Sequence, residues 1–231
     1  MYPVILKFGP IIIYSWGLMV AMAVLSAIFI TIHFAKQEKI RPETVFDLFG
    51  YLIIFSVIGA RLSYVLSFPD QFLKNPISIL FVQEGGLAFF GGFLFAVGCV
   101  FYYARIKKLD LFKLLDVLSP GTAIGYSIGR IGCYLNGCCY GISIFGIQHP
   151  TQVYSSISGL MVFFLALTIY RKKKYDGQVF WSSLCLYTLL RSVIEFFRFS
   201  PIHLLIVTPS QAISAIVFVI TSYILWKKRT T

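Results

Sequence analysis

The chain has 231 residues, of which 58% are hydrophobic, 17% aromatic and only 13% charged. Soluble domains contain about 25% charged residues, so this composition excludes an ordinary soluble protein and indicates a polytopic membrane protein. The net charge of +11 does not indicate nucleic-acid binding, because the basic residues form short clusters beside apolar segments and no basic folded face.

Seven apolar segments are long enough to cross a bilayer, since a transmembrane helix needs about 20 residues. They lie near residues 10–33, 44–68, 86–104, 117–137, 152–170, 178–197 and 208–226. We therefore expect an all-α integral membrane protein, a seven-helix transmembrane bundle that forms a single domain over residues 1–231. The first segment is too long for the apolar core of a signal peptide, so we expect it to be retained as a helix.

The basic residues predict the orientation of this bundle. Most of them follow the first, third, fifth and seventh segments: Lys36, Lys39, Arg41; Arg105, Lys107, Lys108, Lys113; Arg171, Lys172, Lys173, Lys174; and Lys227, Lys228, Arg229. The opposite side has only Lys7, Lys74 and Arg198. Because basic loops stay in the cytoplasm, the N terminus is predicted outside and the C terminus in the cytoplasm. We expect the clusters to contact anionic lipid headgroups.

Three arginines lie inside apolar segments: Arg61 in the second, Arg130 in the fourth and Arg191 in the sixth. Each precedes the outer end of its segment by about six or seven residues, roughly 10 Å of helix. A charge within the membrane costs about 2.5–3.5 kcal/mol and therefore indicates a functional site. Because the arginine fork binds phosphate oxygens in pairs, we expect a phosphate site near the outer headgroups. Snorkelling or pairing with a buried carboxylate is the alternative.

The third segment begins with the sequence GGLAFFGG, residues 85–92. Its glycine pairs, which include Gly91 and Gly92, permit close backbone approach to another helix or to a ligand. On physical grounds alone, helix packing is the simpler role.

Five cysteines are present: Cys99, Cys133, Cys138, Cys139 and Cys185. The first and last lie in the middle of segments and are expected to pack. The other three cluster near the outer side, where a disulfide from Cys133 to Cys138 or Cys139 is permitted. A reactive thiol activated by Arg130 and inert packing are alternatives. The C-x4-C-C spacing lacks the paired loops of zinc sites, so we predict no metal.

The sequence HPTQVY, residues 149–154, begins the fifth segment. Pro150 is a favourable first helical residue, and the free amides there are able to bind an anion, although an interfacial histidine is more often a cap. In the sixth segment, YTLLRSVIEFFR places Tyr187, Arg191, Glu195 and Arg198 on one helical stripe. A purely structural pair between Arg191 and Glu195 is the alternative to a functional one.

Several motifs in order carry a resemblance over nearly the whole chain: WGLM, GARLSYVL, GGLAFFGG, GRIGCYLNGCCYG, HPTQVY, LYTLLRSVIEFFR and PSQAIS. Together they resemble the prolipoprotein diacylglyceryl transferases. The resemblance implies transfer of a diacylglyceryl group from phosphatidylglycerol to the thiol of a lipobox cysteine, with release of glycerol phosphate. The thiol attacks the glycerol carbon next to the phosphate, forming a thioether.

The resemblance also implies a setting and partners. We expect a multi-pass protein of the bacterial cytoplasmic membrane whose active site faces the outer leaflet. Its partners are phosphatidylglycerol, prolipoprotein lipobox peptides and membrane lipids, with no cofactor and no nucleic acid. A lipid-modifying paralogue of the same fold with another acceptor is one alternative. A non-enzymatic lipid-binding, thiol-redox or transport protein is another.

The family's functional residues carry over to matching positions. Arg130 and Arg191 match its two essential arginines, and Tyr187 lies on the helix of the second, so these three are the catalytic candidates. The candidates for binding phosphatidylglycerol are Arg130, Gly129, Asn136, Gly141, Arg61, Gly91 and Gly92. The supporting candidates are Glu195, Arg198, His149, Gln152, Tyr154, Cys133, Cys138 and Cys139.

The chain departs from the family pattern at several positions. Phe90 replaces a family histidine taken to activate the thiol, Cys133 replaces an asparagine and Cys138 an acidic residue. Trp16 replaces a tyrosine, and the external insertion before HPTQVY is reduced to about eight residues. Two compensations are open. In the first, the acceptor thiol needs little activation, because a few per cent of a free cysteine is already thiolate near neutral pH. In the second, His149 or a cysteine thiolate of this chain is the base.

Overall fold

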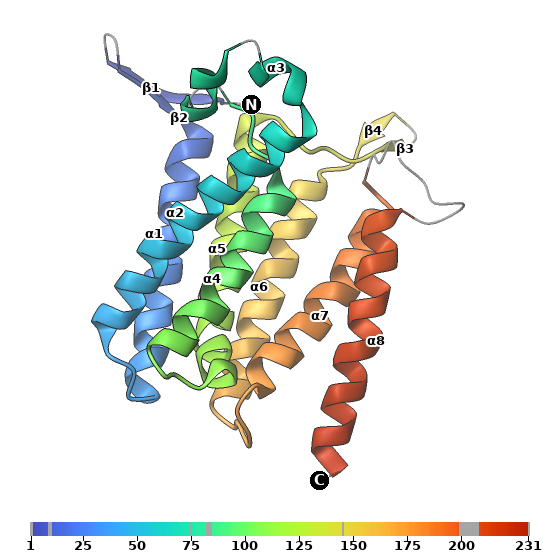
Figure 1. Cartoon of the computed structure of the whole chain (residues 1–231). Coiled ribbons are helices and arrows are strands. Elements are labelled where there is room, and N and C mark those ends of the chain that lie inside the picture. The colour runs from blue at the N-terminus through green and yellow to red at the C-terminus, as the bar shows by residue number, and fades with distance from the viewer. Residues whose placement is uncertain are drawn as a thin grey trace. The chain divides into compact units, whose positions relative to one another are not determined.

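The computed structural model describes residues 2–8, 11–73, 75–81, 85–144, 146–198 and 208–230. This part of the chain contains seven long helices: α1 (Ser15–Gln37), α2 (Pro42–Ser67), α4 (Phe89–Ile106), α5 (Leu111–Asn136), α6 (Thr151–Tyr170), α7 (Gln178–Glu195) and α8 (Pro209–Thr230) (Figure 1). The shorter elements are α3 (Pro69–Leu73), the 3-10 helix η1 (Pro76–Leu80), and the antiparallel pairs β1 (Val4–Phe8) with β2 (Ile11–Tyr14) and β3 (Ser143–Ile144) with β4 (Ile147–Gln148).

Five of the long helices, α1, α2, α4, α6 and α8, are long and apolar enough to cross a bilayer. Many of their large apolar side chains are exposed on the surface of the protein, as expected for helices that face lipid. Phe29, Leu94 and Val219, for example, are each at least 66% exposed. The other two, α5 and α7, contain Asp116, Arg130, Arg191 and Glu195. The prediction of a helical integral membrane protein is confirmed, and the count of seven spans stays a prediction.

The helix ends differ from the predicted segments mainly at two places. Residues 11–14, predicted within the first helix, form strand β2, so that prediction was wrong there. Strand and helix have the same apolar composition at this point, which is why hydropathy did not separate them. The fourth segment, predicted from residue 117, forms a longer helix that begins at Leu111 and continues through Pro120.

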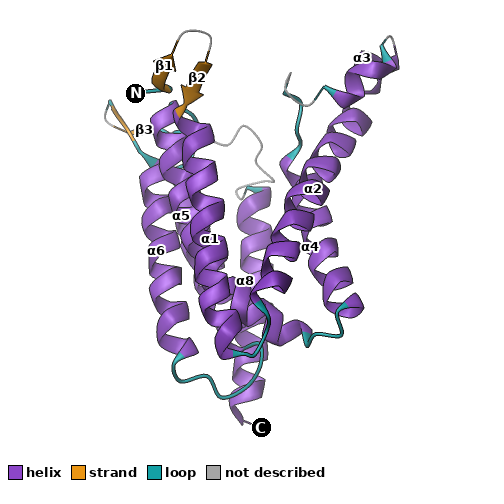
Figure 2. Ribbon diagram, turned by 90° about the vertical axis from the view of Figure 1, so that its left-hand side faces the viewer, coloured by secondary structure: helices purple, strands orange, loops and turns teal. Residues whose placement is uncertain are grey.

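The chain divides into two compact units, Met1–Phe34 with Leu115–Thr231, and Ala35–Leu114. In the second unit α2 packs along α4 (Figure 2). The two helices approach closely at Gly59 and Gly91. A Cβ atom on Gly91 would lie 2.3 Å from the carbonyl oxygen of Gly59, and one on Gly59 would lie 2.6 Å from that of Gly91. Glycine at both positions therefore allows direct backbone contact between the helices.

In the first unit α5 is packed between α1 and α6. On the α1 side, a Cβ on Gly121 would lie 2.7 Å from the carbonyl oxygen of Ala27. On the α6 side, the Ser127 hydroxyl donates to the carbonyl oxygen of Ser156 at 2.9 Å. Helix α7 packs against both α6 and α8. Several polar side chains of α5 and α7 are buried against neighbouring helices, among them Asp116, Ser127, Thr188 and Glu195.

Candidate active site

The guanidinium of Arg191 on α7 is paired on one side only. Its Nη2 lies 2.7 Å from Oε2 of Glu195, one turn further along the helix, and the Glu195 side chain is 4% exposed. Its Nη1 is buried and has no hydrogen-bond partner among the described residues. A buried N–H group without an acceptor is costly, so this atom is a candidate donor to a group outside the described residues.

Glu195 is itself fixed by the beginning of α8. Its Oε1 accepts a hydrogen bond from the Thr208 hydroxyl at 3.4 Å. Thr208 and Gln211 form a reciprocal capping box, because the Gln211 N–H donates to the Thr208 hydroxyl and the Thr208 N–H donates to the Gln211 side chain. The cap of α8 thus holds Glu195, and Glu195 holds Arg191.

Arg130 on α5, which also belongs to the first unit, lies over an aromatic ring. Its Cζ is 5.0 Å from the ring centroid of Tyr126, one turn earlier. That ring contacts Tyr187 of α7 edge to face at 5.4 Å. Both guanidiniums, of Arg130 and of Arg191, act electrostatically on the Tyr187 hydroxyl. The structure therefore brings the three predicted catalytic residues together, with Tyr126 as a fourth member that the sequence analysis missed.

Arg130 also lines a pocket of about 200 Å³ between α5 and α6. The other lining residues are Ile131, Tyr134, Val153, Ser156 and Ile157. In the described part of the chain no carboxylate forms an ion pair with Arg130. The pocket combines one unneutralised cation with apolar walls, which suits a ligand that has an anionic head and an apolar tail.

Arg61, in the second unit, has a different environment. Its Nε donates to the carbonyl oxygen of Ile79, Nη1 to those of Gly85 and Gly86, and Nη2 to those of Ser78 and Phe81. The ring of Phe72 lies 5.2 Å from its Cζ. All five N–H groups are thus used within the protein. The geometry favours a structural role, holding η1 and residues 85–86 against α2, over a phosphate contact.

The four glycines predicted to bind phosphatidylglycerol also have two kinds of environment. Gly91 and Gly92 face α2, where a Cβ would lie 2.3 and 3.0 Å from carbonyl oxygens, so helix packing explains them. Gly141 pairs with Arg198, and a Cβ there would lie 2.2 Å from the carbonyl oxygen of Phe197. Gly129 alone among these faces open space, with no atom within 4 Å of a Cβ. Packing therefore does not account for glycine at position 129, beside Arg130.

The loop after α5 is fastened to the first turn of α6. The Thr151 hydroxyl donates to the carbonyl oxygen of Cys139 at 2.9 Å, and Nε2 of Gln152 donates to that of Cys138 at 2.5 Å. Gln152 is 1% exposed, and its Oε1 has no partner among the described residues. Asn136, the last residue of α5, is exposed, and its side chain hydrogen-bonds to the Cys138 thiol.

The three outer cysteines are free thiols, so no disulfide joins them in this structure. Their sulfur atoms lie within 4.8 Å of one another. Burial and the neighbouring thiols raise the pKa of the Cys138 thiol to about 11. Cys138 is therefore protonated near neutral pH, which argues against the prediction of an activated thiolate at this residue.

His149 is engaged by its neighbours. Its Nδ1 lies 3.1 Å from the Tyr154 hydroxyl, and its ring packs on Phe197 at 5.2 Å. The backbone around it pairs with the end of α7 through Gly141 and Arg198. These predicted supporting residues form one cluster of contacts that joins the β3–β4 hairpin to the residues at the end of α7.

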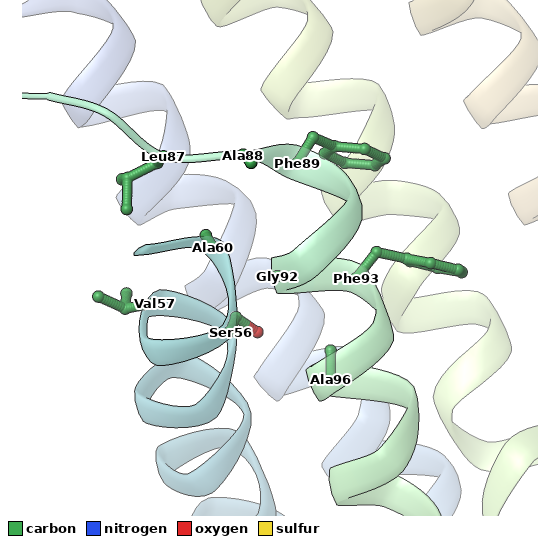
Figure 3. Close-up of a pocket in the computed structure, with 9 residues that line it drawn as sticks. All are labelled: Ser56, Val57, Ala60, Leu87, Ala88, Phe89, Gly92, Phe93 and Ala96. Carbon is green, nitrogen blue, oxygen red and sulfur yellow. The ribbon is translucent and has the colours of Figure 1, made fainter. Parts of the chain in front are cut away.

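Phe90, at the start of α4, is 71% exposed and contacts Phe89 edge to face at 5.9 Å. Beside it, α2 and α4 form an apolar groove of about 470 Å³ (Figure 3). The residues that line it are Ser56, Val57, Ala60, Leu87, Ala88, Phe89, Gly92, Phe93 and Ala96. The groove is apolar and open, and it fits a hydrocarbon chain better than a polar group.

Asp116 on α5 is a buried carboxylate that the sequence analysis did not single out. It accepts hydrogen bonds from the N–H groups of Gly177 and Phe180, both at 2.8 Å, and so caps the beginning of α7 from another helix. Lys173 lies 3.5 Å away as its counter-ion. Asp116 lies one residue before the predicted fourth segment, so it was not counted among the charges within the segments, although the helix that forms begins at Leu111 and includes it.

The chain is similar to known proteins along most of its length. The profile of the family described as prolipoprotein diacylglyceryl transferase matches residues 3–227. The chain belongs to this family. A phosphatidylglycerol–prolipoprotein diacylglyceryl transferase of Finegoldia magna is 31% identical over 88% of this chain and 86% of its own length. Relatives of the same name from Clostridium tetani (29% identical, 97% and 96% covered) and Thermus thermophilus (31%, 86% and 84%) are similar to it along most of their lengths.

Membership of the diacylglyceryl transferase family confirms the resemblance predicted from the motifs. The catalytic candidates Arg130, Tyr187 and Arg191 all lie in the first compact unit, whereas Arg61, Gly91 and Gly92 lie in the second. The roles assigned to individual residues by the resemblance stay predictions.

Proposed function

We propose that the chain transfers the diacylglyceryl group of phosphatidylglycerol to the thiol of a prolipoprotein lipobox cysteine. The family match and the names of the relatives support this activity. The observation that carries the site assignment is the buried Nη1 of Arg191, which has no hydrogen-bond partner in the part of the chain that the structure describes and lies near the same tyrosine as Arg130.

The chemistry requires such cations. The acceptor sulfur forms a bond to the glycerol carbon next to the phosphate, and the bond from this carbon to the phosphate oxygen breaks. The phosphodiester, with one negative charge, leaves as glycerol phosphate, which carries additional negative charge. The thiol proton is released to a base or to water. Guanidiniums held in place before the reaction stabilise the charge that develops on the leaving phosphate.

Each residue of the site has a part in this proposal. Arg191 contributes Nη1 to the phosphate while Glu195 fixes its orientation through Nη2. Arg130 approaches from α5 and lines the pocket between α5 and α6. Tyr187 interacts electrostatically with both cations, and its hydroxyl donates a hydrogen bond to a phosphate oxygen.

This chain differs from the family pattern in the group that accepts the proton of the acceptor thiol. Phenylalanine at position 90 has no atom that accepts a proton. Nδ1 of His149 lies 3.1 Å from the Tyr154 hydroxyl, and in the tautomer in which Nδ1 donates to that hydroxyl, Nε2 is an acceptor. The proposal assigns the thiol proton to solvent or to His149, and a His149→Gln variant separates these routes.

The protein is a multi-pass membrane protein, and we place its site at the outer leaflet of the bacterial cytoplasmic membrane. The basic clusters after α1, α4 and α6 and at the end of α8 support this orientation. With the N terminus outside, the ends of α5 and α7 that carry Arg130 and Arg191 face outward, where secreted prolipoproteins present their lipobox.

The test uses the purified full chain in detergent micelles with phosphatidylglycerol and a synthetic lipobox peptide. Mass spectrometry should detect a diacylglyceryl thioether on the peptide cysteine. Arg191→Gln or Arg130→Gln should reduce turnover by about 100-fold or more, the usual cost of one lost transition-state donor. Arg171→Gln, an exposed arginine at the end of α6, is the matched control and should retain activity. Undiminished turnover by Arg191→Gln would overturn the site assignment.

A further inference from the structure

The end of α5 brings two cysteines together by its backbone geometry. Gly137 adopts a left-handed conformation with φ of 77°, its N–H donates to the carbonyl oxygen of Tyr134, and the Cys138 N–H donates to that of Cys133. This is a Schellman motif, in which the residue after the left-handed glycine folds back onto the residue five positions earlier. Cys138 is therefore placed against Cys133 by the helix cap itself.

The third cysteine is held beside them. Cys139 has a positive φ of 65°, uncommon for a residue other than glycine, and its sulfur lies 3.6 Å from that of Cys138. The carbonyl oxygens of Cys138 and Cys139 are bound by Gln152 and Thr151 of α6. The backbone of the loop is thus fixed, and the three side chains are left as free thiols.

The spacing of the sulfur atoms fits a metal ion. All three lie within 4.8 Å of one another. Metal–sulfur bonds of about 2.3 Å around one ion place three sulfurs roughly 4 Å apart, so small side-chain rotations suffice. No histidine or carboxylate of the described residues joins the group. An all-thiolate set of three selects soft cations, Cu(I) in trigonal geometry or Zn(II) with water as fourth ligand.

We propose that Cys133, Cys138 and Cys139 form a binding site for one soft, thiophilic d10 cation. Each thiol binds as a thiolate, so binding releases up to three protons and involves no oxidation or reduction. This goes beyond the proposed transferase function, because the three thiols take no part in the transfer step.

The site adjoins the candidate active site. Cys133 follows Arg130 by three residues on α5 and interacts with it electrostatically. An ion held by three thiolates carries a net negative charge beside this guanidinium and so competes with an anionic substrate for it. Occupancy should therefore slow the transfer reaction, a second readout that rests on the proposed function.

The decisive experiment measures metal binding and is independent of activity. The full chain, purified in detergent, is reduced, freed of metal with a chelator and titrated under nitrogen with Zn(II) in one arm and buffered Cu(I) in the other. Bound metal is counted by mass spectrometry of the ion, and free thiols by N-ethylmaleimide labelling followed by peptide mapping. We expect one ion per chain and protection of Cys133, Cys138 and Cys139 only.

Variants separate this site from adventitious thiol binding. Cys133→Ser, Cys138→Ser and Cys139→Ser should each weaken binding about 100-fold or more, since loss even of an outer-shell partner costs 10- to 100-fold. Cys99→Ser and Cys185→Ser are the matched controls and should bind as the parent does. Absence of stoichiometric binding in both arms, equal weakening by Cys185→Ser, or a disulfide among the three thiols that resists reduction would overturn the proposal.

Discussion

Nη2 of Arg191 lies 2.7 Å from Oε2 of Glu195, whereas Nη1 of the same guanidinium has no hydrogen-bond partner among the described residues. Nη2 therefore has a structural role in the ion pair, and Nη1 is available to donate a hydrogen bond to a ligand. The contribution to stability and the proposed phosphate contact are separable by mutation, because removing Arg191 and Glu195 together leaves no unpaired buried charge and also no guanidinium for the phosphate.

Arg191→Leu should destabilise the protein by about 3–5 kcal/mol, because it leaves Glu195 buried without its counter-charge. The double variant Arg191→Leu/Glu195→Leu should recover most of this loss, as measured by thermal melting in detergent, and should still lack transferase activity. The exposed pair of Arg41 and Glu43, 3.4 Å apart, is the matched control, and its double leucine variant should change little. Recovery of activity together with stability would show that Arg191 is only structural.

Gly129→Ala should leave stability unchanged or raise it by up to about 1 kcal/mol, because alanine favours a helix and the added methyl group meets no protein atom. If phosphatidylglycerol approaches α5 there, kcat/KM should nevertheless fall by about tenfold, equivalent to about 1.4 kcal/mol of lost binding. Gly98→Ala, which also faces open space, should retain full activity. Equal activities of the two variants would remove Gly129 from the substrate site.

Arg61→Lys should loosen η1 and residues 85–86 while leaving the packing of α2 on α4 intact. Lysine keeps the charge but has three donors and no planar fork, so at least two of the five carbonyl contacts are lost. Hydrogen exchange should accelerate in residues 75–88 and stay unchanged in the middle of α2. The corresponding Arg41→Lys change, at an exposed position, is the control. Unaltered exchange in residues 75–88 would contradict the structural role.

Asp116→Ala should lower the free energy of unfolding by about 3–5 kcal/mol, since it removes a buried carboxylate that caps α7 and pairs with Lys173. Asp176, which also contacts Lys173 but is 42% exposed, is the matched control, and its alanine variant should lose no more than about 1 kcal/mol. Thermal melting measures both. A parent-like melting temperature for Asp116→Ala would be inconsistent with this cap.

The long helices and the Arg191–Glu195 pair were predictable because both depend on local patterns. Apolar length fixes a helix in a bilayer, and a spacing of four residues places two side chains on one face. The hairpin of β1 and β2 was not predicted, since its residues are as apolar as the helix that follows. Cross-helix contacts such as Asp116 with Gly177 depend on the packing of distant segments, which no local spacing encodes.

The cysteine cluster lies between these cases. A glycine four residues after Cys133 and directly before Cys138 is the sequence pattern of a Schellman cap, and it predicts contact between the two cysteines. The position of Cys139 depends instead on hydrogen bonds from α6. Arg61 illustrates the limit of such patterns, because its partners are main-chain carbonyl groups, which every residue has.

That choice of partners has a consequence for how the segment can evolve. An arginine that donates to main-chain carbonyl oxygens depends on the path of the backbone and does not depend on which side chains the backbone carries. Among the five residues whose carbonyl oxygens bind Arg61, Gly85 and Gly86 are constrained as residues, with φ of 88° and 74°, and a Cβ on Gly86 would lie 2.7 Å from Nη1 of Arg61. Substitutions of the side chains of Ser78, Ile79 and Phe81 should therefore leave the Arg61 contacts in place, which makes η1 a suitable position for an engineered label or epitope.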